Sequence, residues 1–453
     1  MKGAKALEIS LFPPQNGGMS TQAKTIAFHT LGCKTNQLET STLSGQFASL
    51  GWQMVDFDDP ASVYVINTCT VTERADQDSR RAIRRAKLSN PHGCVIVTGC
   101  YAQVAPGEIA GLPGVDFVIG NAEKDRIPEV LDQNPEPPVP VVRVSEIDKS
   151  RIIEGASNAG IDRTRGSLKI QDGCDYKCTY CIIWEARGPS RSLPVDDLKL
   201  HLRRMVEEGF KEVVLTGINI GQYEHEGADL SDLLHALMII EGDFRLRLTS
   251  LDPLEVTQKL IDTIAVGVQR GKICPHVHLS AQSAEDTVLK RMGRRHHVQN
   301  MLWACEELVR QVPDINIGSD IIVGFPGEDA DKFETTYSNL ERCSMHYFHV
   351  FSFSRRSGTP AAEFPEQIPE REKKQRAKRL RELSEQKQQA YAQRFVGREL
   401  SVIVEESCQK GMSENYLHVT LNANGLILNP NDQAMVCVID ATPEAVTGQV
   451  LSI

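Results

Sequence analysis

The sequence has 453 residues, too many for one ordinary hydrophobic core, so two or three domains are expected. Hydrophobic residues make up 41% and charged residues 24% of the chain, and no apolar run approaches the length of a membrane span, which excludes a typical membrane protein. The net charge of −10 excludes a uniformly basic surface, so a nucleic-acid partner would have to bind at local basic patches.

The first part of the chain, residues 1–22, is expected to be a flexible extension. A glutamate, two prolines and a glycine pair interrupt any apolar core, so this segment does not read as a signal peptide. The chain also contains 12 cysteines. Without an export signal, these cysteines favour a reducing cytoplasm and metal binding over a disulfide framework.

Residues 23–134 are predicted to form an N-terminal parallel α/β sandwich domain. Strands are expected at residues 25–30, 62–67, 94–98 and 115–119, with helical stretches between them. Strands that alternate with helices are typical of a parallel sheet that helices cover on both faces.

Three cysteines each follow the end of a predicted strand in this domain: Cys33, Cys69 and Cys100. Ligands of such sheets bind at the carboxyl ends of the strands, so the three thiols are expected to lie close together. Three thiolates are one fewer than a [4Fe–4S] cluster normally takes. Topology alone leaves two alternatives open, an iron–sulfur cluster or three buried cysteines. Cys94 begins its strand, at the far end of the sheet, and is interpreted as an inert core residue.

Residues 135–163 are predicted to be an extended surface linker, because four prolines precede a polar stretch that contains glycine. The next domain, residues 164–395, has strand candidates at residues 168–171, 212–216, 245–249, 276–279, 315–323 and 346–352. Six βα units predict an open (βα)₆ partial TIM barrel, whose chemistry belongs at the C-terminal ends of the strands.

Cys174, Cys178 and Cys181 follow the first strand of this domain in one short loop. The C-x₃-C-x₂-C spacing brings three thiolates together and leaves one iron of a [4Fe–4S] cluster without a protein ligand. An open iron can bind a small molecule, as an open zinc position binds water. The alternatives are zinc, which usually takes four ligands in two separated pairs, or three unrelated core cysteines. The spacing favours the cluster.

The C-terminal part combines a long charged helix with a small β domain. Residues 366–394 are rich in lysine and arginine near residues 371–381, and by themselves they would indicate a solvated connecting helix. Residues 396–453 contain four predicted strands, at residues 400–405, 416–421, 435–440 and 448–451. This pattern predicts a small β-barrel of the oligonucleotide-binding kind.

The C-x₃-C-x₂-C loop resembles the signature of the radical S-adenosylmethionine (SAM) enzymes. Together with that loop, the segments Leu31-Gly32-Cys33-Lys34, Asn67-Thr68-Cys69-Thr70 and Thr98-Gly99-Cys100 resemble the methylthiotransferases of that superfamily. The resemblance implies SAM and two [4Fe–4S] clusters, a radical cluster on the cysteines of the loop and an auxiliary cluster on the three cysteines of the N-terminal domain. It also implies that residues 396–453 form a TRAM-like RNA-binding domain.

The resemblance further implies which residues surround SAM. The expected SAM-binding residues lie at or after predicted strand ends: Thr216, Gly217, Ser250, Gln282 and Gly324. Arg187, after the cysteine loop, is expected to act in catalysis by pairing with a carboxylate or phosphate. Two positions depart from the family pattern, because Trp184 stands where proline is usual and Ala284 where glycine is usual. SAM affinity is the property that these departures would change.

Residues 32–37 and the basic helix around residues 80–87 resemble the branch that modifies N6-threonylcarbamoyladenosine in tRNA. The expected reaction converts this nucleoside, next to the anticodon, to its 2-methylthio derivative by radical SAM chemistry. Its carboxylate requires a cation, for which Arg187, Arg355 and Arg356 are the candidates. The expected partners are tRNA, an electron donor of the flavodoxin or ferredoxin type and a sulfur source for the auxiliary cluster. The alternatives are isopentenyladenosine in tRNA or a ribosomal-protein aspartate as substrate, and a non-catalytic iron–sulfur RNA-binding protein.

Overall fold

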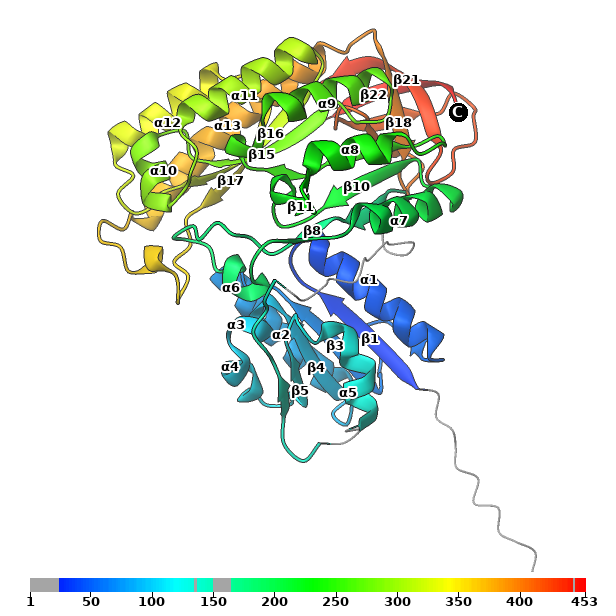
Figure 1. Cartoon of the computed structure of the whole chain (residues 1–453), viewed down its shortest axis with the longest axis vertical. Helices are drawn as coiled ribbons and strands as arrows, with labels where there is room; N and C mark the ends of the chain where they lie inside the picture. Colours follow the sequence, from blue (N-terminus) through cyan, green and yellow to red (C-terminus); the bar gives the residue numbers. More distant parts are fainter. Residues whose placement is uncertain (1–23, 134–136, 150–163, 443–444) are drawn as a thin grey trace, which may run out of the picture.

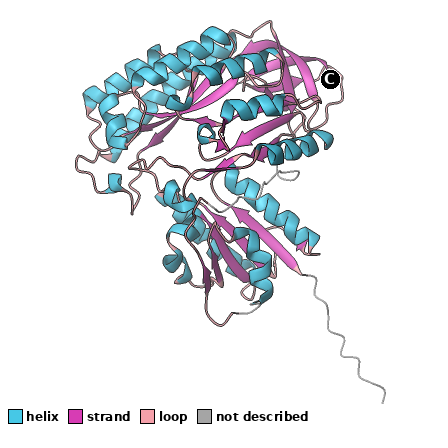
Figure 2. Ribbon diagram, in the orientation of Figure 1, coloured by secondary structure: helices cyan, strands magenta, loops and turns pink. Residues whose placement is uncertain are grey.

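The computed structural model describes residues 24–133, 137–149, 164–442 and 445–453, so the predicted N-terminal extension lies outside the described residues. The chain forms an N-terminal α/β domain, a central open barrel and a C-terminal β-barrel (Figure 1 and Figure 2). The predicted fold class is confirmed in all three parts. Within the described ranges, no helix is both long enough and apolar enough to cross a membrane.

The N-terminal domain is built on one six-stranded parallel sheet with the strand order β2-β1-β3-β4-β5-β6. Its strands are β1 (Thr25–Thr30), β2 (Gln53–Met54), β3 (Val63–Thr68), β4 (Cys94–Gly99), β5 (Phe117–Ile119) and β6 (Val141–Arg143). Its helices are α1 (Lys34–Ser49), α2 (Glu73–Ser89), α3 (Cys100–Val104), α4 (Pro106–Ala110), the 3₁₀ helix η1 (Lys124–Arg126) and α5 (Ile127–Gln133).

Helices cover both faces of this sheet. Phe47 of α1 and Ile127 of α5 pack on one face, and Ile83 of α2 and Ala102 of α3 pack on the other. Every residue of β3 is buried, as expected for a central strand that is covered on both sides. Since β1, β3 and β4 are parallel neighbours, their C-terminal ends lie together at one edge of the sheet.

The prediction that residues 135–163 form an extended linker is corrected in part. Val141–Arg143 forms β6, which pairs with β5 and extends the sheet by one strand. Val141 also packs against the core on one face of the sheet. Prolines suggested a linker here, but an edge strand tolerates prolines next to it because its outer side needs no ladder hydrogen bonds. Residues 150–163 lie outside the described residues.

The open barrel contains six parallel βα units in sequence order, in two sheets with the orders β13-β10-β7 and β14-β15-β16-β17. Its strands are β7 (Gly166–Lys169), β10 (Glu212–Thr216), β13 (Arg245–Leu248), β14 (Ser250–Leu251), β15 (His276–Gln282), β16 (Asn316–Val323) and β17 (Tyr347–Ser352). β13 corresponds to the third predicted strand, residues 245–249, and the short β14, which was not predicted, follows it after Thr249. The short pairs are β8 (Gln171–Asp172) with β9 (Arg191–Ser192), and β11 (Glu224–His225) with β12 (Ala228–Asp229).

Helices pack on the outside of this barrel (Figure 1). They are α7 (Val195–Glu207), α8 (Leu230–Met238), α9 (Gln258–Gln269), α10 (Asp286–Met292), α11 (Val298–Gln311), α12 (Ala330–Arg342), and the 3₁₀ helices η2 (Ile220–Gln222) and η3 (Pro253–Glu255). The helix α6 (Ile183–Arg187) instead contacts α3 of the N-terminal domain, and the 3₁₀ helix η4 (Pro360–Ala362) follows β17. Side chains alternate along a strand, so Val213 and Leu215 of β10 join this outer core while Val214 and Thr216 line the lumen.

The helix α13 (Glu370–Gln393) packs along β17 and leads into the C-terminal barrel, which is closed with the order β18-β19-β20-β22-β21. Its strands are β18 (Glu399–Val404), β19 (Lys410–Ser413), β20 (His418–Asn422), β21 (Gln433–Ala441) and β22 (Val446–Ser452). The strand β19 was not predicted, because its short sequence contains lysine, glycine and serine. Tertiary pairing makes it a strand, since the barrel closes through it.

The C-terminal barrel docks at the N-terminal end of β10 and β13. Glu212 is fully buried and forms ion pairs with both Arg245 and Arg247. Although burial alone would raise the pKa of Glu212, these two arginines hold it at about 2. Arg245 also donates to the carbonyl of Ser401 at 3.2 Å, and Arg247 to that of Ser413 at 3.0 Å. The two barrels are thus joined by buried, fully paired charges.

Candidate active site

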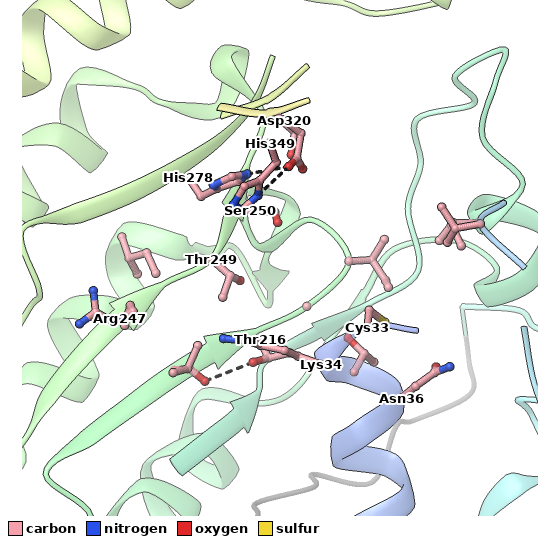
Figure 3. A pocket seen from close by; sticks show the side chains of 18 of the residues that line it. Cys33, Lys34, Asn36, Thr216, Arg247, Thr249, Ser250, His278, Asp320 and His349 are labelled. Atoms are coloured by element: carbon pink, nitrogen blue, oxygen red, sulfur yellow. Dashed lines mark hydrogen bonds and ion pairs between the residues drawn. The ribbon is translucent and has the colours of Figure 1, made fainter. Parts of the chain in front are cut away.

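One cavity of about 490 Å³ extends from the N-terminal domain into the lumen of the open barrel (Figure 3). Cys33, Cys69 and Cys100 line it on the side of the N-terminal domain. Strand ends of the open barrel line the other side through Thr216, Gly217, Thr249, Ser250 and Ser280. Tyr416 of the C-terminal barrel also lines the cavity. Its volume lies in the range that holds a small molecule or a nucleobase.

The three cysteines of the N-terminal domain meet at the carboxyl edge of its sheet, as their positions after strand ends predicted. Cys33 precedes α1, Cys69 follows β3 and Cys100 begins α3. Gly32 has a φ of +97°, and a Cβ there would lie 2.8 Å from Sγ of Cys69. Only glycine therefore lets the turn after β1 approach Cys69 so closely.

These thiols fit a [4Fe–4S] cluster. Burial raises the pKa of Cys69 to about 11 and also raises the pKa of Cys100. Both thiols are therefore protonated at neutral pH in the iron-free protein, and iron binding would make the thiolates favourable. Asn121 lies with Nδ2 3.9 Å from Sγ of Cys100, and an N–H group near sulfur is typical of cluster sites.

A buried ion network connects α1 with the open barrel next to these cysteines. The carboxylate of Glu39 binds Nζ of Lys124 at 2.5 Å and Nζ of Lys169 at 2.9 Å, and it also pairs with Arg187. Asp172 binds Lys169 at 2.8 Å and Arg187 at 3.2 Å. Nη2 of Arg191 also lies 3.8 Å from Oδ2 of Asp172. Four cations of the described residues thus face two carboxylates, which leaves an excess of positive charge beside a site for negatively charged thiolates.

Arg187 is placed differently from the expectation. Its side chain is 1% exposed, and its guanidinium binds Glu39, Asp172 and Oδ1 of Asn36. A substrate carboxylate would have to displace these partners, so the expected pairing of Arg187 with the substrate is not seen in this geometry and its role in catalysis stays a prediction. The geometry makes Arg187 a positioning residue that ties α1 to the barrel, and its charge also favours the thiolate of Cys100.

Cys174, Cys178 and Cys181 lie in the loop between β8 and α6, at the C-terminal end of the first βα unit. The backbone N–H of Tyr176 donates to Sγ of Cys174 and that of Ile183 to Sγ of Cys181, both at 3.4 Å. Burial raises the pKa of Cys174 to about 11 and that of Cys181 to about 12. Three thiols with N–H groups aimed at sulfur fit a [4Fe–4S] cluster that keeps one open iron.

Arg294 borders this loop and was missed in the sequence. Its Nη1 lies 3.6 Å from Sγ of Cys178, while Nη2 lies 2.5 Å from a carboxylate oxygen of Asp252 and from the carbonyl of Ser280. A buried cation beside a cluster ligand stabilises the thiolate form. Arg294 is far from the loop in the sequence and has no characteristic spacing, so only the fold reveals it.

The five expected SAM-binding residues fall into two groups. Thr216, Gly217 and Ser250 line the cavity. Gln282 and Gly324 do not belong to its lining; both have left-handed backbone angles, with φ of +67° and +72°. For Gln282 such an angle costs energy and marks a constrained position at the end of β15. Their contacts with SAM stay predictions.

The lumen face of β15, β16 and β17 carries a second group that sequence reasoning did not identify. His278, Asp320 and His349 line the cavity there, together with Tyr347 (Figure 3). A signal was present, because histidines 276 and 278 alternate with the apolar residues Val277 and Leu279, as expected when one face of a strand lines a polar cavity.

The comparisons with known proteins agree with this geometry. Residues 25–120 match the family model described as "Uncharacterized protein family UPF0004", and residues 168–340 match "Radical SAM superfamily". The chain is 40% identical to "Threonylcarbamoyladenosine tRNA methylthiotransferase MtaB" of Bacillus subtilis, over 86% of this chain and 87% of the relative. The chain belongs to the radical SAM tRNA methylthiotransferase family.

Two further similarities concern a relative that is named for another tRNA nucleoside and a solved structure with a similar fold. The methylthiotransferase is 30% identical to "tRNA-2-methylthio-N(6)-dimethylallyladenosine synthase" of Staphylococcus haemolyticus, over 86% of this chain and 77% of the relative. Its fold is similar to that of the radical SAM methyltransferase TsrM from Kitasatospora setae, with a TM-score of 0.55, 13% identity and 75% of each chain covered. Membership of the radical SAM superfamily implies SAM and a [4Fe–4S] cluster.

The basic helices of this methylthiotransferase are less available to RNA than the sequence suggested. Arg80, Arg81 and Arg85 of α2 each pair with a carboxylate. In α13, Lys373 and Arg376 are buried. The exposed basic row on α13 comprises Arg371, Lys374 and Lys378. These three lie one turn apart along one helix face, where they can meet a phosphate backbone.

The remaining candidate cations for a substrate carboxylate are also engaged. Arg356 pairs with Asp76 and donates to Thr70, both in the N-terminal domain. Arg355 donates to the carbonyl of Ala362 at 2.7 Å. Arg356 is thus buried and paired with a carboxylate, whereas Arg355 is exposed and, among the described residues, donates only to a neutral carbonyl, so its role as a cation for the substrate stays a prediction. Arg356 instead fixes the carboxyl edge of the N-terminal sheet against the open barrel.

Proposed function

We propose that this methylthiotransferase converts N6-threonylcarbamoyladenosine, next to the anticodon of tRNA, to its 2-methylthio derivative. We further propose that Cys33, Cys69 and Cys100 hold a second [4Fe–4S] cluster. The observation that carries both statements is the shared cavity, which three thiols line on one side and the strand ends of the radical SAM barrel on the other. A base in this cavity faces both sets of groups at once.

The chemistry requires both sites because C2 of adenine carries a C–H bond that is inert toward polar reagents. When bound, the two clusters and SAM would supply a carbon radical that removes this hydrogen atom, a sulfur atom that replaces it, and, from a second SAM, the methyl group that the sulfur carries. The residues of the chain keep the two sites at a fixed separation. Arg187 and Arg356 do so through buried ion pairs between the N-terminal domain and the barrel.

The cavity suits a base that has left its stack. An unpaired base beside the anticodon can be splayed out into a pocket at low cost. Tyr416 stacks on His276 with ring centroids 4.2 Å apart and provides an aromatic wall from the C-terminal barrel. We propose that this barrel and the exposed basic row on α13 hold the tRNA backbone.

Two arguments favour the threonylcarbamoyl substrate over isopentenyladenosine. The relative named for the former is 40% identical and the relative named for dimethylallyladenosine 30% identical. In addition, the threonylcarbamoyl group carries a carboxylate, whereas the isopentenyl group is a hydrocarbon. A wall with histidine, aspartate and tyrosine side chains is polar and suits a hydrocarbon group poorly.

The proposed partners are an electron donor of the flavodoxin or ferredoxin type and a sulfur source that rebuilds the auxiliary cluster. The test of substrate and reaction is nucleoside mass spectrometry on tRNA treated with the reconstituted enzyme. We expect methylthio product only on tRNA that already carries the threonylcarbamoyl group. Product on isopentenyladenosine, with none on threonylcarbamoyladenosine, would contradict the proposed substrate.

A further inference from the structure

Three neighbouring strands of the open barrel each contribute one metal-ligating side chain to the same wall of the cavity (Figure 3). These are His278 of β15, Asp320 of β16 and His349 of β17. Asp320 pairs directly with His349 in the strand register, and His278 pairs with Gly318, two residues before Asp320. Since side chains two residues apart point to the same face, the register brings all three together.

The three side chains converge on one point. Oδ1 of Asp320 lies 3.0 Å from Nε2 of His278 and 3.3 Å from Nδ1 of His349. One ligand atom from each residue lies within 4.8 Å of the other two. In the part of the chain that the structure describes, Asp320 has ion pairs only with these histidines. Two imidazole nitrogens and one carboxylate oxygen form a donor set that divalent transition metals accept.

A tyrosine fixes the orientation of the more buried histidine. Oη of Tyr347 lies 3.3 Å from Nδ1 of His278 and 2.9 Å from Nε2 of His276, which leaves Nε2 of His278 facing Asp320. A Cβ at Gly318 would lie 2.3 Å from this Oη, so glycine makes room for the tyrosine. Metal-binding histidines usually have their second ring nitrogen held by such an outer partner.

We propose that His278, Asp320 and His349 bind one divalent metal ion such as Fe²⁺, Zn²⁺ or Mn²⁺, whose remaining positions face the cavity and take a carboxylate of the substrate. With neutral imidazoles the three side chains carry one negative charge. A divalent ion reverses this charge, and one substrate carboxylate then neutralises it. The second half of the proposal rests on the proposed function, because of the two tRNA nucleosides only threonylcarbamoyladenosine brings a carboxylate. It also accounts for anion binding in a cavity whose lining arginines, Arg187 and Arg247, are already paired with carboxylates.

The metal site is tested with Mn²⁺ alone, because thiolates prefer softer metals and do not compete for it. Reconstituted enzyme without SAM or tRNA is titrated with Mn²⁺, and free Mn²⁺ is measured by its solution EPR signal. We expect about one bound Mn²⁺ per chain, loss of binding in Asp320→Asn and His349→Ala, and roughly tenfold weaker binding in Tyr347→Phe.

His297→Ala is the matched control. His297 also lies beside a carboxylate, that of Asp286 at 3.4 Å, but it does not line the cavity. The control should bind Mn²⁺ as the unchanged enzyme does. Cluster absorbance and the thermal midpoint show which variants are folded, and the near-isosteric Asp320→Asn is chosen so that the fold survives. No Mn²⁺ binding by the unchanged enzyme, or binding that survives in folded Asp320→Asn, would overturn the metal site.

The substrate ligand is tested separately by the relaxation of water protons at the bound Mn²⁺. Free threonylcarbamoyladenosine should displace coordinated water and lower the relaxation enhancement, whereas isopentenyladenosine should leave it unchanged. Equal effects of the two nucleosides would overturn the carboxylate assignment. Because this readout needs no turnover, it is independent of the activity assay. Methylthio product confined to isopentenyladenosine, with Mn²⁺ still bound, would contradict the proposed function and leave the metal site standing.

Discussion

The two sets of cysteines differ in how the chain assembles them. Cys174, Cys178 and Cys181 lie in one short loop, and their sulfur atoms receive N–H groups from that same loop and from Arg294. The cysteines of the N-terminal domain come from the ends of three separate strands. The ion network beside them includes residues from both the N-terminal domain and the barrel.

This contrast indicates which site depends on the interface. A local loop keeps its ligands together whenever the barrel is folded. The auxiliary site needs the N-terminal sheet for its own ligands and the interdomain ion pairs for its position in the cavity. Changes at the interface should therefore affect sulfur transfer more than SAM cleavage.

The largest effect is expected from removing the three cysteines of the short loop in the open barrel. Replacing Cys174, Cys178 and Cys181 together by alanine should abolish cleavage of SAM to 5′-deoxyadenosine and methylthio product alike. Iron should fall by about half, from roughly eight to four per chain, because one of two four-iron clusters is lost. Iron analysis and chromatography of the products measure both. Iron content equal to that of the unchanged protein would show that these thiols are not the ligands.

A second effect separates the sites through the ion network. Arg187→Met leaves Glu39 and Asp172 with fewer partners, and removing one partner of a buried ion pair typically costs roughly 3 kcal/mol. We expect a lower thermal midpoint and a larger loss of methylthio product than of SAM cleavage. The control is Arg81→Met, which breaks the exposed pair with Asp78. Equal losses of both activities in Arg187→Met would contradict its positioning role.

The sequence predicted the cysteine loop of the open barrel and most of the strands that form the three domains. The six barrel strands were expected close to their observed bounds, because short apolar or alternating polar and apolar segments stand between turn signals. The spacing of the cysteine loop is visible in the sequence without any fold. By contrast, topology alone left the role of Cys33, Cys69 and Cys100 open, because the approach of Gly32 to Cys69 exists only in the folded chain.

The missed residues share a physical cause. The partners of Arg187 include Glu39, and those of Arg356 include Asp76, so both ion pairs join distant segments and leave no spacing to recognise. The arginines were read as free cations because charge is visible in a sequence and pairing is not. Tyr416 reaches the cavity only because the C-terminal barrel docks at the N-terminal end of β10 and β13 in the open barrel.

A smaller effect is expected from the C-terminal barrel. Deleting the residues after Gly397 would remove the predicted RNA-binding domain. It would also remove the carbonyl oxygens that accept hydrogen bonds from the buried Arg245 and Arg247, and so it would disturb the open barrel. A point variant is cleaner. Tyr416→Ala removes the aromatic wall against which we propose that the base packs, and stacking of a base on an aromatic ring is worth about 1–3 kcal/mol, so product formation should fall roughly tenfold.

SAM cleavage should persist in this variant, and Tyr416→Phe should behave like the unchanged enzyme because it keeps the ring. Quantifying 5′-deoxyadenosine and methylthio nucleoside in one reaction gives both values. Full product formation by Tyr416→Ala would show that the C-terminal barrel does not contribute to the active site.

The most direct test of the two-site account is the ratio of methylthio nucleoside to 5′-deoxyadenosine in Cys69→Ala, with Cys94→Ala as control. Cys94 begins β4 at the opposite end of the same sheet, so its loss should leave the ratio unchanged. In Cys69→Ala, 5′-deoxyadenosine should still form while methylthio nucleoside disappears, because only the auxiliary site has lost a ligand. Methylthio product at the normal ratio, or loss of both products in a variant that keeps its radical cluster, would contradict the division of roles between the two sets of cysteines.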